Sequence, residues 1–147
     1  MGQQQLLLVI LVTIIVGIAT VVAINTFSAA ADSANVDAAR QDALSIAAAA
    51  QQYYMKPTAL GGGGQTFTDI DFSTISGVPV DRVSGEPTQA VNQNGSYVIA
   101  PGSDSFTITV YPSSCYDGSS FNEGCSADSD ISSLTATVRA DEISWTG

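Results

Sequence analysis

The sequence predicts an α+β protein in which a small antiparallel β-sheet packs on the C-terminal half of one long N-terminal α-helix. Two observations predict the helix: residues 6–24 carry no charge, and residues 25–56 contain neither proline nor glycine. A third observation predicts the sheet, because short runs of strand-forming residues alternate with turn residues after Pro57. We therefore divide the chain into an apolar helix over 1–27, an amphipathic continuation over 28–56 and a β-rich region over 57–147.

The charged side chains all lie after residue 31, where four Lys and Arg and fourteen Asp and Glu give a net charge of -10. An acidic surface repels phosphate, which argues against nucleic acid as a partner. Histidine is absent, which removes the commonest general base and many metal sites. No Ser, Cys or carboxylate has a recognisable base or metal partner in the sequence. We therefore expect no enzymatic activity, no metal and no cofactor.

The first element is apolar on every side. Leu6 to Ile24 is a run whose only polar members are Thr13 and Thr20. Its length matches one hydrocarbon core, so the segment can cross a membrane as a helix. A cleaved signal peptide, the alternative, would have a basic n-region and a shorter apolar run. Because no basic side chain precedes this run, we expect the segment to be retained, with Met1 as the mature N-terminus.

The second element, residues 28–56, continues the helix and is amphipathic. Its apolar residues recur at three- and four-residue steps, a pattern typical of a helix with one packed face. Pro57 disfavours helix in the residue before it, so we expect the helix to end near Met55 or Lys56 and to be about 80 Å long. The predicted apolar stripe consists of Val36, Ala39, Ala43, Ala47, Ala50 and Tyr54.

The third element, residues 57–147, begins with a glycine run at 61–64 that predicts a flexible hinge or a set of tight turns. The runs beyond it predict an antiparallel sheet of about four strands, wrapped on the helix stripe. In residues 106–110 the apolar side chains fall on one face, as in a half-buried strand, and residues 100–105 predict a hairpin turn. The candidate strand runs are 65–73, 95–101, 104–112, 133–140 and 142–147.

The two cysteines, Cys115 and Cys125, lie in a polar, turn-rich stretch. In a reducing cytosol they would be two small hydrophobic side chains. Free thiols in an exposed loop are a liability, however, and one bridge would staple a loop that has little core of its own. We favour a disulfide between them, which predicts an extracytoplasmic location.

Asn94-Gly95-Ser96 fits the pattern of an N-glycosylation acceptor. The match is weak in a sequence this rich in Asn, Gly and Ser, and the same residues are typical of a hairpin turn. The sequence therefore predicts a turn here, with glycosylation as the alternative.

The order of these elements resembles the type IV pilin superfamily, in which a long apolar N-terminal helix leads into an amphipathic half, a small sheet and a disulfide loop. The resemblance is architectural over the whole chain and reaches motif level only within residues 1–25; "GQQQLLL" and "QQYYMKPTALGGGG" also resemble a bacterial pilin-like group. In the family, the fifth mature residue is a glutamate that pairs with a neighbouring subunit's amino terminus. Here that position is Gln5, an amide that can accept a hydrogen bond from an ammonium group.

The resemblance implies a structural, major pilin-like subunit of an extracellular helical filament. Such a subunit would rest in the inner membrane before assembly and would then bury the same apolar surface against copies of itself, as a homo-oligomer. No surface ligand of the filament can be named from the sequence. The residues expected to carry assembly are Met1, Gln3, Gln4, Gln5, Leu6, Leu7, Ile10, Ile14, Gly17 and Val21.

Two other functions remain open. One is a minor pilin or pseudopilin of a secretion or DNA-uptake machine. The other is a monomeric, membrane-anchored domain whose C-terminal region binds a ligand at the cell surface. Fibres in sheared cell-surface material would indicate the filament, whereas a detergent-soluble monomer would indicate the binding domain.

Overall fold

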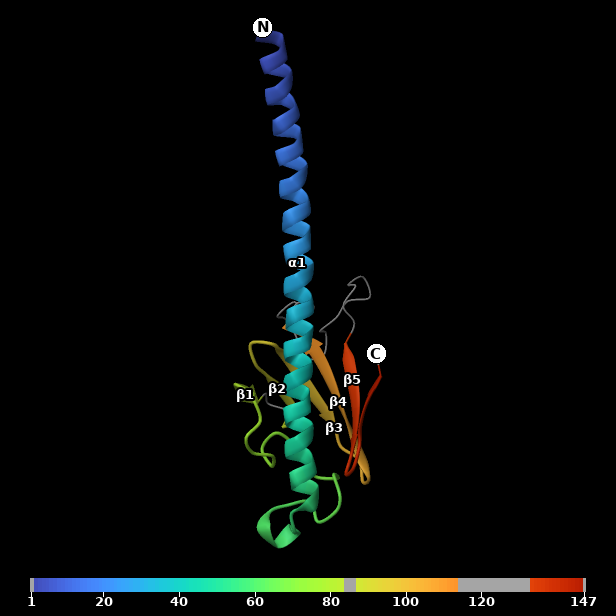
Figure 1. Ribbon diagram of the computed structural model, residues 1–147. Coiled ribbons are helices and arrows are strands. Elements are labelled where there is room, and N and C mark those ends of the chain that lie inside the picture. The colour runs from blue at the N-terminus through green and yellow to red at the C-terminus, as the bar shows by residue number, and fades with distance from the viewer. Residues whose placement is uncertain (1, 84–86, 114–132, 147) are drawn as a thin grey trace. The chain divides into compact units, whose positions relative to one another are not determined.

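The structure is a computed structural model that describes residues 2–83, 87–113 and 133–146. It confirms the predicted α+β class, with one long helix and an antiparallel sheet (Figure 1). The helix, α1 (Gly2–Met55), runs through both compact units of the chain, Met1–Ala34 and Asn35–Gly147. We call the second of these the globular unit. The disulfide predicted between Cys115 and Cys125 and the N-terminal residue Met1 lie outside the described residues.

Helix α1 ends at Met55, as the sequence predicts. Pro57 has an extended backbone (φ -60°, ψ 149°), which the helix cannot continue through. A short 3₁₀ turn, η1 (Thr58–Leu60), follows and closes on Gly61 in the left-handed region (φ 75°). The position of the helix end is therefore set by local backbone chemistry.

The glycine run forms tight turns that satisfy the last carbonyls of α1. The amide of Gly63 donates to the Tyr53 carbonyl (2.8 Å), and the amide of Gln65 donates to the Tyr54 carbonyl (2.9 Å). A Cβ at Gly63 would lie 2.1 Å from the Thr66 carbonyl oxygen, so the backbone requires glycine there. Of the two interpretations of this run, the structure supports turns, because these hydrogen bonds cap the orphan carbonyls of the helix.

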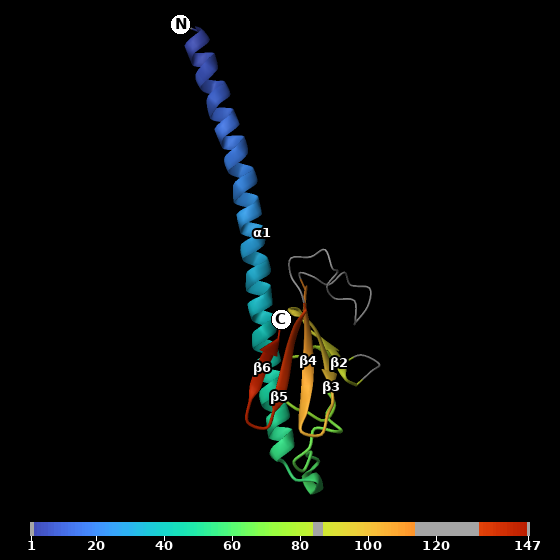
Figure 2. The same cartoon turned by 90° about the vertical axis from the view of Figure 1, so that its right-hand side faces the viewer.

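The sheet has six antiparallel strands that pair in chain order, β1-β2-β3-β4-β5-β6. Figure 2 shows β2 to β6 side by side, so strands that follow one another in the chain are also neighbours in the sheet. Their bounds are β1 (Arg82–Val83), β2 (Gln89–Val91), β3 (Gly95–Ala100), β4 (Ser105–Pro112), β5 (Leu134–Arg139) and β6 (Ile143–Thr146).

The expectation of about four strands was too low, and one expected strand was wrong. The run 65–73 forms turns, whereas the short strands β1 and β2 were not predicted. In that run the Asp71 carboxylate accepts hydrogen bonds from the amides of Ser73 and Thr74, both at 2.8 Å. This side-chain capping competes with strand pairing and wins, although the apolar residues still become buried. The hairpin turn between β3 and β4 is confirmed.

The core of the globular unit lies between the sheet and the C-terminal part of α1. On β4 the burial alternates strictly, and Ile108 pairs with Ile99 of β3 on one side and Ala136 of β5 on the other. The buried helix residues are Ala39, Ala43, Ile46, Ala47, Ala50 and Tyr53, which include four of the six predicted stripe residues. Val36 and Tyr54, the other two, pack against this core and are half-buried. Small alanines let the sheet approach the helix closely.

Candidate functional site

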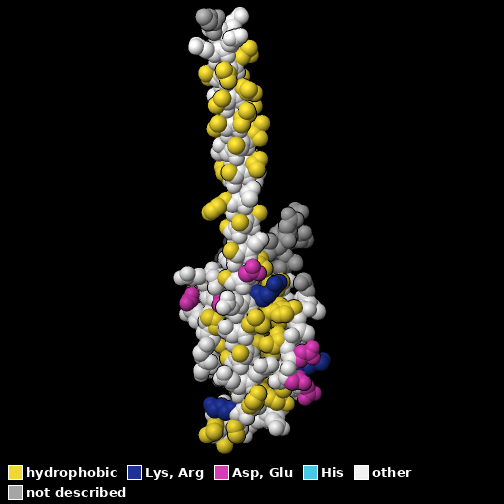
Figure 3. Space-filling view, in the orientation of Figure 1, with side chains coloured by type: hydrophobic (Ala, Val, Ile, Leu, Met, Phe, Trp, Pro, Cys, Tyr) yellow, Lys and Arg dark blue, Asp and Glu magenta, His cyan; other side chains and the backbone are white. Residues whose placement is uncertain are grey.

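The first candidate site is the apolar segment, which we define as Leu6–Phe27 of α1. Every residue from Gly2 to Ala31 is exposed in the single chain. Fifteen large hydrophobic side chains in the apolar segment are 46–78% exposed. Figure 3 shows hydrophobic side chains over this part of the helix. Helix α1 is thus long and apolar enough to cross a membrane.

The threonine hydroxyls of the apolar segment form their hydrogen bonds within the helix and need no partner outside it. The hydroxyls of Thr13, Thr20 and Thr26 donate to the carbonyls of Ile10, Val16 and Val22, at 2.8–2.9 Å. A threonine that bonds to its own helix carries no free donor into an apolar medium. The segment is therefore apolar in its hydrogen bonding as well as in its composition.

The predicted assembly residues that the structure describes, all except Met1, are at the surface of the single chain. The leucines and isoleucines among them are 46–67% exposed, and a Cβ at Gly17 would meet nothing within 4 Å. The side chains of Gln3, Gln4 and Gln5 are exposed and form no hydrogen bond with the part of the chain that the structure describes. Their amide groups are free to contact a partner.

The second candidate site is a polar cluster in the globular unit, centred on Asp42 of α1. The Asp42 Oδ2 atom accepts three hydrogen bonds, from Asn92 Nδ2 (2.7 Å), Asn94 Nδ2 (2.7 Å) and the Tyr97 hydroxyl (3.0 Å). All three donors come from β3 or the turn that precedes it. Hydrogen bonds to a carboxylate are the strong kind, so this cluster ties the helix to the β2–β3 hairpin.

The turn between β2 and β3 is organised by Asn92. Its Oδ1 atom accepts from the amides of Asn94 (2.9 Å) and Gly95 (3.1 Å), while its Nδ2 atom also donates to the Pro79 carbonyl (2.6 Å). Asparagine commonly stabilises tight turns in this way. The same side chain thus fixes the turn and presents the donors that reach Asp42.

The electrostatics of the cluster follow from its burial. The Tyr97 side chain is fully buried, and this burial raises the pKa of its hydroxyl above the usual value. The hydrogen bond and the negative charge of Asp42 raise that pKa further, and the hydrogen bond with Asn92 offsets them only in part. The hydroxyl therefore stays protonated and remains a donor to the carboxylate.

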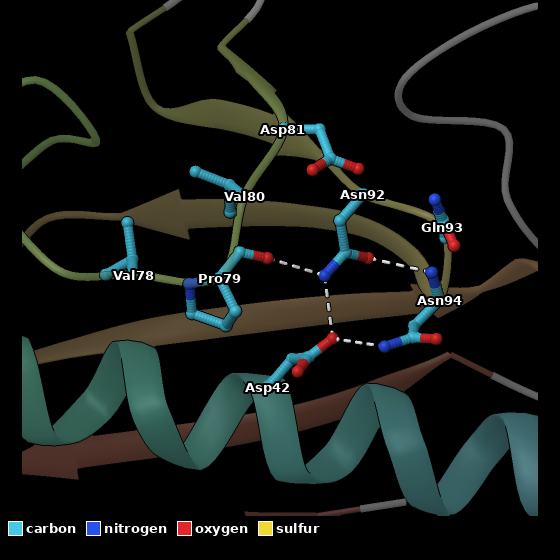
Figure 4. A pocket seen from close by; sticks show the side chains of 8 residues that line it. All are labelled: Asp42, Val78, Pro79, Val80, Asp81, Asn92, Gln93 and Asn94. Atoms are coloured by element: carbon cyan, nitrogen blue, oxygen red, sulfur yellow. Dashed lines mark hydrogen bonds between the residues drawn. The ribbon is translucent and has the colours of Figure 1, made fainter.

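An open cavity of about 310 Å³ lies beside the cluster (Figure 4). Among the residues that the structure describes, two carboxylates line this cavity, and no cysteine or lysine does. The three hydrogen bonds to Asp42 are made within the chain. The cluster therefore connects α1 to the β2–β3 hairpin and leaves no free base at Asp42 Oδ2. The lining residues are Asp42, Val78, Pro79, Val80, Asp81, Asn92, Gln93 and Asn94.

The position of Asp42 in the helix is a sequence signal for this cluster, although the predicted apolar stripe did not include it. Asp42 lies three residues after Ala39 and four residues before Ile46, both fully buried, so helical periodicity places it at the edge of the packed face. A carboxylate in that position needs donors. The amide-rich stretch 92–95 supplies them, but only the fold brings the two together.

Comparison with protein-family models, with curated proteins and with solved structures finds no match for this chain.

Proposed function

We propose that this protein is a structural subunit of an extracellular helical filament, similar to the type IV pilins, in which copies of the apolar segment pack against one another. The observation that carries the proposal is the exposure of apolar side chains on every side of this segment. A helix that is apolar all round is stable only in a membrane or inside a protein assembly.

The size of the exposed surface argues against a segment that stays in water. Burying one large aliphatic side chain contributes about 1.5–3 kcal/mol. The fifteen large apolar side chains of the segment, Phe27 included, are 46–78% exposed, so burying their remaining surface represents a driving force on the order of 20 kcal/mol. Lipid can hold this surface before assembly, and a bundle of identical helices can hold it afterwards, with every side still covered.

The distribution of charge supports the same proposal. The first charged side chain is Asp32, so no charge has to leave water when the apolar segment becomes buried. The segment presents no unique binding face, and a contact repeated from copy to copy without closure generates an open fibre. In this proposal Gln3, Gln4 and Gln5 contact a neighbouring subunit through their free amides.

The test combines electron microscopy of sheared cell-surface material with variants of one apolar residue. Val16→Asp places an unpaired charge in the proposed helix bundle. Burying such a charge costs about 3 kcal/mol or more. We expect Val16→Asp to abolish fibres. Val16→Leu keeps the position apolar and serves as the matched control, which should assemble normally.

Other outcomes would identify the alternatives. Normal fibre yield from Val16→Asp would remove the helix bundle from the proposal. Fibres made of another chain, with this protein confined to their tips or bases, would indicate a minor pilin or pseudopilin. A monomer extracted only by detergent, without fibres, would indicate a membrane-anchored binding domain.

A further inference from the structure

The turn of the polar cluster contains the only Asn-Gly pair in the chain, Asn94-Gly95. An asparagine followed by glycine is the pair most prone to deamidation, because glycine has no Cβ to obstruct its own amide nitrogen. In that reaction the Gly95 nitrogen attacks Asn94 Cγ and loses its proton to solvent, and the Cγ–Nδ2 bond breaks to release ammonia. Water then opens the succinimide to aspartate or isoaspartate, so the only co-reactant is water.

Gly95 cannot be replaced by another residue without disturbing the sheet. A Cβ at position 95 would lie 2.3 Å from the carbonyl oxygen of Tyr111 and 3.1 Å from Cα of Pro112 on β4. Both are backbone atoms held in the sheet, where Gly95 pairs with Pro112. Glycine is therefore required at this position by close approach of two strands. The reactive pair has to be protected in another way.

The polar cluster holds both reacting atoms of this pair. The Gly95 amide donates to Asn92 Oδ1 (3.1 Å), and Asn94 Nδ2 donates to Asp42 Oδ2 (2.7 Å). The Asn94 carbonyl accepts from Asn35 Nδ2 (3.1 Å), on the same helix as Asp42, and from the Ser113 amide (2.9 Å). The Gly95 nitrogen, the Asn94 side-chain amide and the Asn94 carbonyl are thus each held by hydrogen bonds. The open cavity beside them still admits water (Figure 4).

We propose that Asn94 is a latent modification site, a deamidation site that the Asp42 carboxylate keeps closed in the folded chain. Conversion of Asn94 destroys the contact with Asp42 that protected it. The new carboxylate replaces the Nδ2 donor that lay 2.7 Å from Asp42 Oδ2, and two like charges at that distance repel strongly. The β2–β3 hairpin then loses its tie to α1, and the change cannot be reversed by refolding.

The same geometry disfavours glycosylation of Asn94. Its Nδ2 atom is engaged with Asp42, and the Ser96 side chain that the acceptor pattern requires is 1% exposed, with no hydrogen-bond partner for its hydroxyl among the described residues. A glycan at this position would need the hairpin to open. At Asn94-Gly95-Ser96 the geometry therefore favours spontaneous deamidation over enzymatic glycosylation.

The proposal is independent of the filament, and peptide mass spectrometry of the full chain in detergent micelles tests it. Samples are held at mildly alkaline pH, folded or in guanidinium, and conversion at Asn94 is followed over time. We expect conversion in guanidinium to be roughly tenfold faster or more, because the strong hydrogen bonds that close the site are then lost. Equal rates, or no conversion at Asn94 in the unfolded chain, would overturn the proposal.

Two variant pairs assign the protection and its consequence. Asp42→Asn should convert at Asn94 several-fold faster than Asp81→Asn, a matched change in the same cavity whose carboxylate makes no bond to Asn94. Asn94→Asp should lower the midpoint of denaturant unfolding, whereas Gln93→Glu, an exposed neighbour with the same change of charge, should not. Equal conversion in the first pair, equal midpoints in the second, or a sugar attached to Asn94 would contradict the proposal. If Asp42→Asn does not fold, the comparison of folded and unfolded parent chain decides.

Discussion

The two halves of α1 have the same secondary structure and opposite relations to the rest of the chain. Between Gly2 and Ala31 every residue is exposed. Between Asn35 and Met55 the helix contributes six buried residues to the core of the globular unit. The backbone forms one continuous helix through both halves, so the two halves differ only in what their side chains contact.

Each half of α1 obtains its stability from a different source. In the second half, burial against the sheet and the turns of residues 65–75 stabilises the helix within a single chain. In the first half no tertiary contact is available among the described residues of the same compact unit, so stability depends on what surrounds the helix. Alanine marks the packed half, where small side chains let the sheet approach the helix closely, and branched aliphatic residues mark the other half, whose apolar surface suits a hydrocarbon environment.

The largest expected effect comes from removing the same kind of side chain from the two halves. Ile46→Ala should lower the free energy of unfolding of the globular unit by about 3 kcal/mol, because Ile46 is fully buried and leaves a cavity. Val16→Ala, at a position that is 57% exposed, should leave that free energy unchanged. The measurement is denaturant unfolding in micelles followed by the fluorescence of Trp145, the only tryptophan. Comparable losses in both variants would show that the two halves of α1 are stabilised in the same way.

A smaller effect is expected from adding a methyl group at one glycine in each part. Gly63→Ala should cost about 2 kcal/mol, because the new Cβ would lie 2.1 Å from the Thr66 carbonyl oxygen and 2.7 Å from the Tyr53 ring. Gly17→Ala has open space around it and should raise local helix stability by about 1 kcal/mol without changing the globular unit. Thermal unfolding of both variants in the same detergent measures the difference. An unchanged midpoint for Gly63→Ala would show that the turn can relax.

Local patterns in the sequence were sufficient for much of this fold. The strict alternation of β4, the turn before Ser105 and the block at Pro57 are each determined within a few residues, and each was predicted. The run 65–73 was misassigned, because its alternating apolar residues resemble a strand while Asp71 folds the backbone into turns. The competition between side-chain capping and strand pairing is decided by partners that a local pattern does not contain.

The candidate sites divide in the same way. The apolar segment is evident from composition, because its character does not depend on any partner within the chain. The Asp42 cluster joins α1 to residues 50–55 positions further along, and no periodicity links them. A buried-edge carboxylate and an amide-rich turn are separately visible in the sequence, but their complementarity is a property of the tertiary structure.

Alkaline pH should act on the globular unit and not on the first half of α1, since residues 2–31 contain no titratable side chain. In an unfolded chain tyrosine titrates near pH 10, and burial with the Asp42 contacts raises the pKa of Tyr97 above that value. The unfolded chain therefore loses this proton first, and stability is full below pH 10 and falls as the pH rises above it, by at most about 1.4 kcal/mol per pH unit. Tyr97→Phe should reduce this slope and cost about 1–2 kcal/mol near neutral pH, because Asp42 loses a donor. Parallel unfolding curves for variant and parent above pH 10 would contradict the assignment.

The smallest expected effect lies at the acid end and concerns the turn that replaced the predicted strand. Burial raises the pKa of the Asp71 carboxyl, but hydrogen bonds from Ser73 and Thr74 outweigh burial and leave this pKa below its usual value. The unfolded chain therefore binds the proton at higher pH than the folded chain does. The contribution of Asp71 is present above about pH 4 and is lost as the pH falls through the lower, folded pKa.

Asp71→Asn should cost about 1 kcal/mol at neutral pH, as for the loss of a helix cap, and the variant should converge with the parent in acid. Asp104→Asn, which removes a carboxylate without hydrogen bonds to the described residues, is the control and should leave the difference near zero at both ends. A cost for Asp71→Asn that stays constant from neutral to acid pH would mean that the turn depends on the shape of this side chain and not on its charge.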